Sequence, residues 1–225
     1  MTVAPQTTFR EAHAVPETQR YPDVGDLRFR GLLSREDWES LPLAIRKRFS
    51  KRAGGGQTIL YAGEVIETRL TFVGRVFAQI ARLAGAPLPL DEADHMPAVV
   101  SVTEDARNGG QIWTRLYTRR QGVPQVIHSS KQFAGRTGLE ECVGGGIGMA
   151  LTVHVDRGAL VFRSRQYFLR LGTLRLSLPA WLAPGALTVT HAEEQQDRFS
   201  FLLEITHPIF GLIIRQLALF REVTP

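Results

Sequence analysis

The chain has 225 residues and 44% hydrophobic content, enough to bury one sizeable core, which excludes a disordered protein. The formal net charge is +5, but the positive residues are scattered apart from a basic patch at residues 46–52. That patch is typical of a solvated helix face, so we expect no nucleic-acid partner. The first residues lack the features of a secretory signal and no apolar run approaches the ~20 residues of a membrane span, so we expect a cytoplasmic protein.

The N-terminal third of the chain predicts a tail followed by helices. Residues 1–33 contain three prolines without a sustained apolar period, and we interpret them as an N-terminal tail or irregular wrap. Residues 34–225 then form a single domain. It begins with a capping box at Ser34, and residues 43–51 follow as a short amphipathic helix with a basic outer face.

A strand and a second helical segment come next. The β-branched residues within 60–69 predict an isolated strand. Residues 70–84 have apolar side chains at helical spacing and a narrow polar stripe, which predicts a helix with an unusually wide apolar face. Such a helix needs cover, and we expect it on the concave side or at the open end of a sheet.

Beyond Pro97 the helical period ends and short strands follow one another between turn signals. The predicted strands are residues 98–104, 111–120, 125–133, 138–143, 149–156, 159–171, 187–192, 199–206 and 212–221. So long an antiparallel meander must close or split, because open sheets of this size leave exposed edges. The predicted fold class is therefore α+β, mainly β: a meander closing into a β-barrel or half-barrel, with two helical segments before the main strand array.

The glycine-rich residues 144–148 invite comparison with phosphate-binding loops. They lack the Gly-Lys-Ser/Thr of a Walker loop and the third glycine of a dinucleotide fingerprint, and no helix follows. A bulge, a sharp bend or a loop at a barrel rim explains them better. We therefore expect no bound cofactor in this chain.

A set of short motifs resembles a family known as domain of unknown function DUF4166. The motifs are Leu41-Pro42 with Ile45-Arg46, Trp113-x-Arg115, Glu141 before the glycine stretch, residues 178–184 (LPAWLAP) and His207-Pro208-Ile-Phe-Gly211. Members also occur fused to saccharopine-dehydrogenase-like NAD-binding domains. The resemblance implies a shared fold, a link to redox or lipid metabolism and a possible NAD-binding oxidoreductase partner, and it assigns no reaction.

Strand alternation places polar side chains beside apolar ones. Trp113, Arg115 and Tyr117 share one strand face, and Glu141 shares a face with apolar neighbours. A carboxylate on an inward face must pair with a cation or stay protonated, and Arg115 and Lys131 are its candidate partners. The cluster is either a buried ion pair that organises the sheet or an anchor for a ligand.

Two further residues are candidates for chemistry or for binding. His191 forms an acid/base pair with Glu141 or Glu193, or else is a hydrogen-bonded structural residue. Trp181, in residues 174–184, belongs to a lid or portal for a lipid-like ligand, or else packs down as a core plug. The same segment, together with the basic helix, is a candidate for peripheral contact with an anionic membrane.

No motif indicates a metal site or a covalent nucleophile. His154 and Asp156 share a strand face without a third ligand, and the single cysteine, Cys142, excludes an internal disulfide. The function that we expect is binding of a hydrophobic or lipid-like small molecule in a barrel pocket. Two alternatives stay open: a cofactor-independent enzyme that uses Glu141, His191 and Arg115, and an interaction module for an NAD-binding partner or a membrane.

Overall fold

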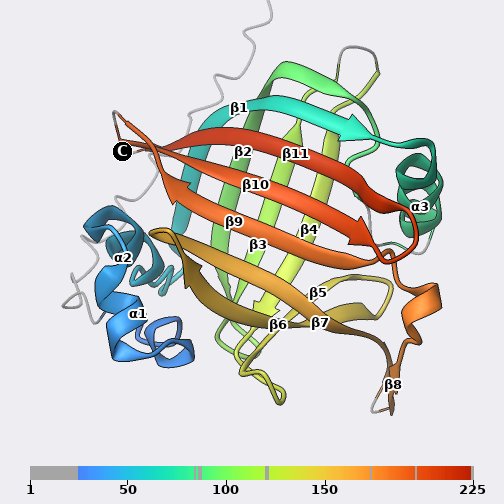
Figure 1. The fold of residues 1–225 in the computed structure, drawn as a ribbon. Coiled ribbons are helices and arrows are strands. Elements are labelled where there is room, and N and C mark those ends of the chain that lie inside the picture. The colour runs from blue at the N-terminus through green and yellow to red at the C-terminus, as the bar shows by residue number, and fades with distance from the viewer. Residues whose placement is uncertain are drawn as a thin grey trace, which may run out of the picture.

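Ten antiparallel strands close into a barrel in the computed structural model, which describes residues 25–223 except 84, 86, 87, 120, 121, 173 and 196 (Figure 1). Each strand pairs with its neighbour in the order β1-β2-β3-β4-β5-β6-β7-β9-β10-β11, and β11 returns to pair with β1. The strands are β1 (Thr58–Leu70), β2 (Ala93–Asp105), β3 (Gly110–Tyr117), β4 (Gln125–Gln132), β5 (Leu139–Gly144), β6 (Ile147–Asp156), β7 (Ala159–Leu171), β9 (Ala186–Glu193), β10 (Arg198–His207) and β11 (Gly211–Val223). The predicted fold class, a mainly β protein with a closed meander, is confirmed.

All nine strands predicted after Pro97 are present. One of them, β2, begins five residues earlier than predicted, and the other ends differ by at most three residues. The prediction that residues 60–69 form an isolated strand is wrong, because β1 pairs along most of its length with both β2 and β11. A short strand that was not predicted, β8 (Leu174–Ser177), pairs with the last residues of β7 outside the closed ring. In a meander the first strand gains a second neighbour only when the sheet closes, and the pattern of a single strand carries no information about closure.

The N-terminal segment seals one end of the barrel. It contains a 3-10 turn, η1 (Arg30–Leu32), and the helices α1 (Arg35–Ser40) and α2 (Leu43–Phe49). Ser34 caps α1 by accepting a hydrogen bond from the Asp37 amide at 3.0 Å, as the capping box predicts. Phe29 and Phe49 insert into the barrel, with ring centroids 5.0 Å apart and both rings near Phe162. These aromatic contacts close the end with apolar surface.

Ion pairs fasten the same segment to the strand ends. Lys51 pairs with Glu222, Arg52 with Glu104, and Arg48 with Glu193 at 3.1 Å. The basic patch of the sequence is thus largely neutralised by carboxylates from three different strands. It lies at the sealed end, whereas residues 174–184 lie at the other end, so the two cannot contact one membrane surface together (Figure 1).

The opposite end of the barrel, which we call the mouth, carries the third helix, α3 (Phe72–Leu83), and the 3-10 turn η2 (Ala180–Leu182) (Figure 1). Gly74 lets α3 approach β11 closely, because a Cβ there would lie 2.1 Å from the Ile213 carbonyl oxygen. The apolar face of α3 is only partly covered: Phe77 faces the barrel interior, while Phe72 and Leu83 are 80% and 88% exposed. The predicted helix at the open end is confirmed.

The glycine stretch forms the β5–β6 turn at the mouth. Gly144, Gly145 and Gly146 have positive φ, and a Cβ at Gly148 would lie 2.5 Å from the Phe168 ring. Of the three interpretations offered for this stretch, the loop at the barrel rim is confirmed, and the strand pairing shifts register beside it, between Cys142 and Gly144.

None of the helices in the described part of the chain is long and apolar enough to cross a membrane.

Candidate functional site

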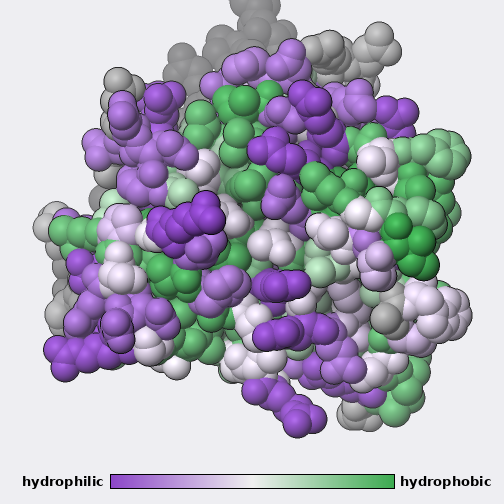
Figure 2. Space-filling model, viewed as in Figure 1, coloured by the Kyte–Doolittle hydropathy of each residue, from purple (hydrophilic) through white to green (hydrophobic). Residues whose placement is uncertain are grey.

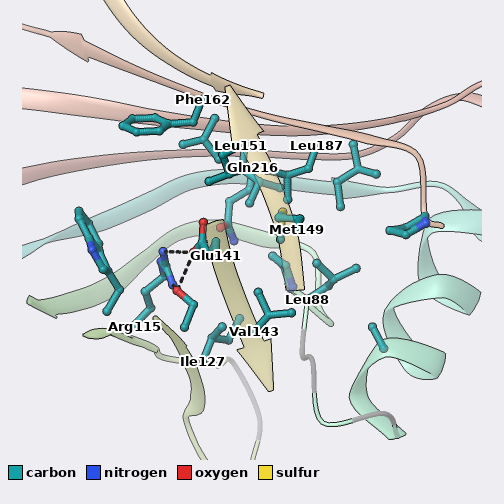
Figure 3. Close-up of a pocket in the computed structure, with 18 of the residues that line it drawn as sticks. Leu88, Arg115, Ile127, Glu141, Val143, Met149, Leu151, Phe162, Leu187 and Gln216 are labelled. Atoms are coloured by element: carbon teal, nitrogen blue, oxygen red, sulfur yellow. Dashed lines mark hydrogen bonds and ion pairs between the residues drawn. The ribbon is translucent and has the colours of Figure 1, made fainter. Parts of the chain in front are cut away.

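The barrel interior holds a cavity of about 230 Å³ that runs from Phe49 at the sealed end to α3 and residues 178–184 at the mouth. Figure 3 shows side chains from opposite walls pointing into it. Apolar side chains make up most of the lining, among them Val100, Ile127, Val143, Met149, Leu151, Leu187, Val189 and Leu203. Successive residues of a strand point alternately to the core and to solvent, and most of the residues that point inward here are apolar.

One polar cluster interrupts this lining, and it joins the residues that strand alternation predicted. Glu141 on β5 pairs with Lys131 on β4, at 2.9 Å between Nζ and Oε2, and with Arg115 on β3 at 3.5 Å. The Ser129 hydroxyl donates to Glu141 Oε1 at 2.6 Å and accepts a hydrogen bond from Arg115 at 2.9 Å. Figure 3 shows Arg115 and Glu141 facing each other at one side of the cavity.

The cluster carries two cations and one carboxylate, and these are the charged side chains among the described residues that line the cavity. Burial opposes ionisation of Glu141, but the charges of Lys131 and Arg115 and the hydrogen bonds from Ser129 and Lys131 outweigh it and lower the Glu141 pKa to about 2. Burial lowers the pKa of Lys131, while Glu141 opposes this shift. Glu141 is therefore an anion at neutral pH, and among the described residues it is the one carboxylate that pairs with Lys131 and Arg115.

Aromatic side chains surround the cluster. Lys131 Nζ lies 4.8 Å from the Trp113 ring centroid and 6.0 Å from that of Phe162, within reach of cation–π attraction. Trp113 donates to Gln111 at 3.1 Å, so its indole nitrogen is satisfied. Tyr117 lines the cavity nearer the mouth, and burial raises its pKa. Trp113, Arg115, Tyr117, Lys131 and Glu141 thus share one cavity, and their roles in binding stay predictions.

His191 lies on the same face of β9 as the cavity residues Leu187 and Val189, but Phe49 and Arg48 cover it from the sealed end. It is fully buried, its Nε2 lies 2.8 Å from Arg48 Nη1, and it contacts Glu141 through no hydrogen bond or ion pair of the described residues. Burial, and secondly the Arg48 charge, hold the His191 pKa well below its ordinary value. The structure does not bring the proposed pair of Glu141 and His191 together.

Arg48 holds the sealed end together around His191. Its guanidinium stacks over the Phe199 ring at 3.9 Å and also pairs with Glu193. His191 is thus hydrogen-bonded through Nε2, as in the other interpretation that the sequence left open, while its buried Nδ1 has no hydrogen-bond partner among the described residues.

Trp181 is 75% exposed on η2 and does not line the cavity, so the expectation of a packed core plug is wrong. Its neighbours Leu178, Leu182 and Pro184 do line the cavity. The segment covers one side of the mouth because β7 diverges from β9 after four paired residues, and residues 178–184 fill the space between them.

Three polar lining residues were not predicted: Ser129, Tyr167 and Gln216. Ser129 could have been found, because it lies two residues before Lys131 on the same strand face. Tyr167 could not, since a bulge at residues 164–166 shifts the alternation of β7 by one residue. Burial raises the Tyr167 pKa to about 12, although the Ser164 hydroxyl acts to lower this pKa. Among the described residues, the Tyr167 hydroxyl has no hydrogen-bond partner of normal geometry.

The described residues contain no group of three or more histidine, cysteine or acidic side chains that could hold a metal ion.

Residues 41–220 match the family described as a domain of unknown function, DUF4166. The chain belongs to this family. The DUF4166 match covers all ten barrel strands at least in part, together with α3 and η2. No curated protein and no solved structure matches the chain significantly. Of the motifs that carried the resemblance, Trp113-x-Arg115 and Glu141 lie in the cavity, and residues 178–184 and 207–211 lie at the mouth of the DUF4166 barrel.

Proposed function

We propose that the barrel binds an amphiphilic small molecule, with its apolar body in the cavity and an anionic group, most simply a carboxylate, next to Arg115 and Lys131. The observation that carries this proposal is that two basic side chains share a single carboxylate in the mostly apolar lining of the described cavity. A buried charge without a counter-charge is costly. An anionic ligand removes this cost, and the Tyr167 hydroxyl supplies a further donor.

The position of the cluster orients the ligand. Lys131 contacts Phe162, which packs on Phe49 of the sealed end with ring centroids 5.7 Å apart. The anionic group therefore lies deep in the barrel and the apolar chain points to the mouth. A cavity of about 230 Å³ corresponds to about eight water volumes, which suits a chain of medium length.

Calorimetric titration with decanoate and with 1-decanol tests the proposal. Arg115→Met removes one charge-assisted contact worth about 1.5–3 kcal/mol, so decanoate affinity should fall roughly tenfold to a hundredfold while decanol affinity changes little. Arg163→Met is the matched control, because Arg163 is exposed on the outer face of β7. Equal loss for both ligands, or no binding of either ligand by the unaltered protein, would contradict the proposal.

The enzymatic alternative finds less support in the geometry. A carboxylate with a pKa of about 2 is a weak base near neutral pH, and His191 is covered by Arg48 and Phe49. Proton transfer in this cavity would have to use Lys131, Tyr117 or Tyr167, and burial disfavours the charged form of each of them.

A further inference from the structure

Exposed apolar side chains gather at the mouth. Of the twenty large hydrophobic residues that are exposed in the described part of the chain, thirteen lie at this end. Four are on α3, three in the β7–β8 hairpin, two on η2, three at the β10–β11 turn and one in the β3–β4 turn. Figure 2 shows hydrophobic residues over α3 and near β8, on the right of the view. Scattered exposed hydrophobic residues need no explanation, but a concentration around one opening indicates an interaction surface.

This mouth surface is continuous with the cavity. Ile80 on α3 and Leu182 on η2 line the cavity and are also 56% and 51% exposed. Phe72, Leu83 and Trp181 extend the same apolar surface outward. A molecule leaving the cavity therefore passes from one apolar surface to another.

Most of the arginines within this surface pair with carboxylates from elsewhere in the chain, Arg75 with Glu92 and both Arg170 and Arg175 with the buried Glu140. In α3, in residues 169–182 and in residues 207–212, the sequence has four arginines and no acidic residue. These arginines are Arg75, Arg82, Arg170 and Arg175. The acidic residues Asp91 and Glu92, which precede β2 at this end, pair with Arg119 and Arg75. Arg82 is the one of these four arginines without a carboxylate partner among the described residues, so the apolar surface keeps a positive charge that complements a bilayer with anionic headgroups.

We propose that the mouth docks onto the surface of an anionic lipid bilayer, with the apolar residues of α3, η2 and the β10–β11 turn inserted at the headgroup boundary. This inference rests on the proposed function, since the docked barrel would exchange its amphiphile directly with the hydrocarbon layer. Trp181 is of the residue type that favours the membrane interface. A second copy fits less well, because a symmetric contact through this surface would block the opening of the cavity.

Vesicle flotation measures the docking. The full-length chain is mixed with phosphatidylcholine vesicles containing either no anionic lipid or a substantial fraction of phosphatidylglycerol. The triple variant F72S/L83S/I209S should bind at least a hundredfold more weakly, because each side chain loses its apolar burial. Arg82→Gln should weaken binding to the anionic vesicles alone, about fivefold, and this effect should disappear in high salt.

Matched controls lie at the sealed end. Leu27 and Leu43 are exposed there to a similar degree, so L27S/L43S should bind vesicles like the unaltered protein, and Lys47→Gln should not reproduce the effect of Arg82→Gln. Absence of vesicle binding, or equal loss in both sets of variants, overturns the inference. The inference is also overturned if sedimentation analysis shows a dimer that dissociates in the mouth variant, F72S/L83S/I209S, and not in L27S/L43S. That result would assign the surface to a second copy.

Decanoate titration separates this inference from the proposed function. The mouth variant should keep its affinity for decanoate in solution, whereas Arg115→Met should lose that affinity and still bind vesicles. If the unaltered protein binds decanoate but no vesicles, the inference alone is refuted. If it binds vesicles but no decanoate, the proposed function alone is refuted.

Discussion

Replacing Glu141 with glutamine should destabilise the protein through the two cations that it leaves behind. Folding lowers the Glu141 pKa from 4.5 to about 2, and a fall of this size corresponds to about 3 kcal/mol of stability at neutral pH. Burial of Lys131 costs part of that gain, so the intact pair contributes little net stability. Removing only the carboxylate leaves Lys131 and Arg115 without a counter-charge, and we expect Glu141→Gln to lower the free energy of unfolding by about 3–5 kcal/mol.

A double-mutant cycle shows whether this cost comes from the pair. Lys131→Met should cost about 2 kcal/mol, since Glu141 keeps Arg115 and Ser129. The double variant E141Q/K131M should be more stable than the sum of the two single effects predicts, by at least about 1.5 kcal/mol. Urea unfolding followed by circular dichroism at pH 7 gives all four values. Additive effects, or Glu141→Gln with unchanged stability, would refute the reasoning.

The pH dependence gives a second measure of the same contact. Because the folded state binds fewer protons than the unfolded state between pH about 4.5 and 2, the stability that Glu141 supplies is present above this window and is lost as the pH falls through it. Glu141→Gln should remove that component of the acid dependence. It should also strengthen decanoate binding, since the internal carboxylate no longer competes for Arg115 and Lys131.

Two further changes test the sealed end and the mouth. Folding lowers the His191 pKa, so below pH about 6.5 the unfolded state binds a proton that the folded state does not bind. Stability should therefore fall as the pH drops below about 6.5. His191→Gln should flatten this part of the pH profile, measured by thermal unfolding. Gly74→Ala should cost at least about 2 kcal/mol in urea unfolding, because its Cβ meets the Ile213 carbonyl, whereas Gly31→Ala, in open space, should be neutral or slightly stabilising. An equal effect of both glycine changes would contradict the close approach of α3 to β11.

Much of the barrel could be predicted because its signals are local. The turns after β2, β3, β4 and β6 contain glycines with positive φ, and the strands between them alternate, so their number and nearly all their bounds follow from the sequence. Alternation also placed Trp113 and Arg115 on one strand face and Glu141 on a face with apolar neighbours, and the structure shows that these faces are the inward ones. Their shared cavity followed from closure, which the length of the meander made the expected outcome.

The remaining features depend on contacts that are distant in sequence. The two partners of β1 are adjacent in space only after the chain closes, and β8 is too short and too exposed to leave a pattern. Tyr167 was missed because a bulge reverses the strand face beyond Ser164. The environment of His191 depends on Arg48, which lies 143 positions away along the chain and reaches it only when α2 seals the barrel.

The barrel is sealed at one end, so a bound molecule enters and leaves through the mouth. This determines which part of the molecule enters first and which part leaves first. What enters first leaves last, since Phe29, Phe49 and the ion pairs of the N-terminal segment allow no passage at the far side. For a guest bound as proposed, the charged head enters first and the chain trails behind it. When the molecule leaves, its apolar chain comes out first, and an apolar chain is the part that dissolves most readily in a bilayer. The charged head would therefore separate from Lys131 only after the chain is already solvated by lipid.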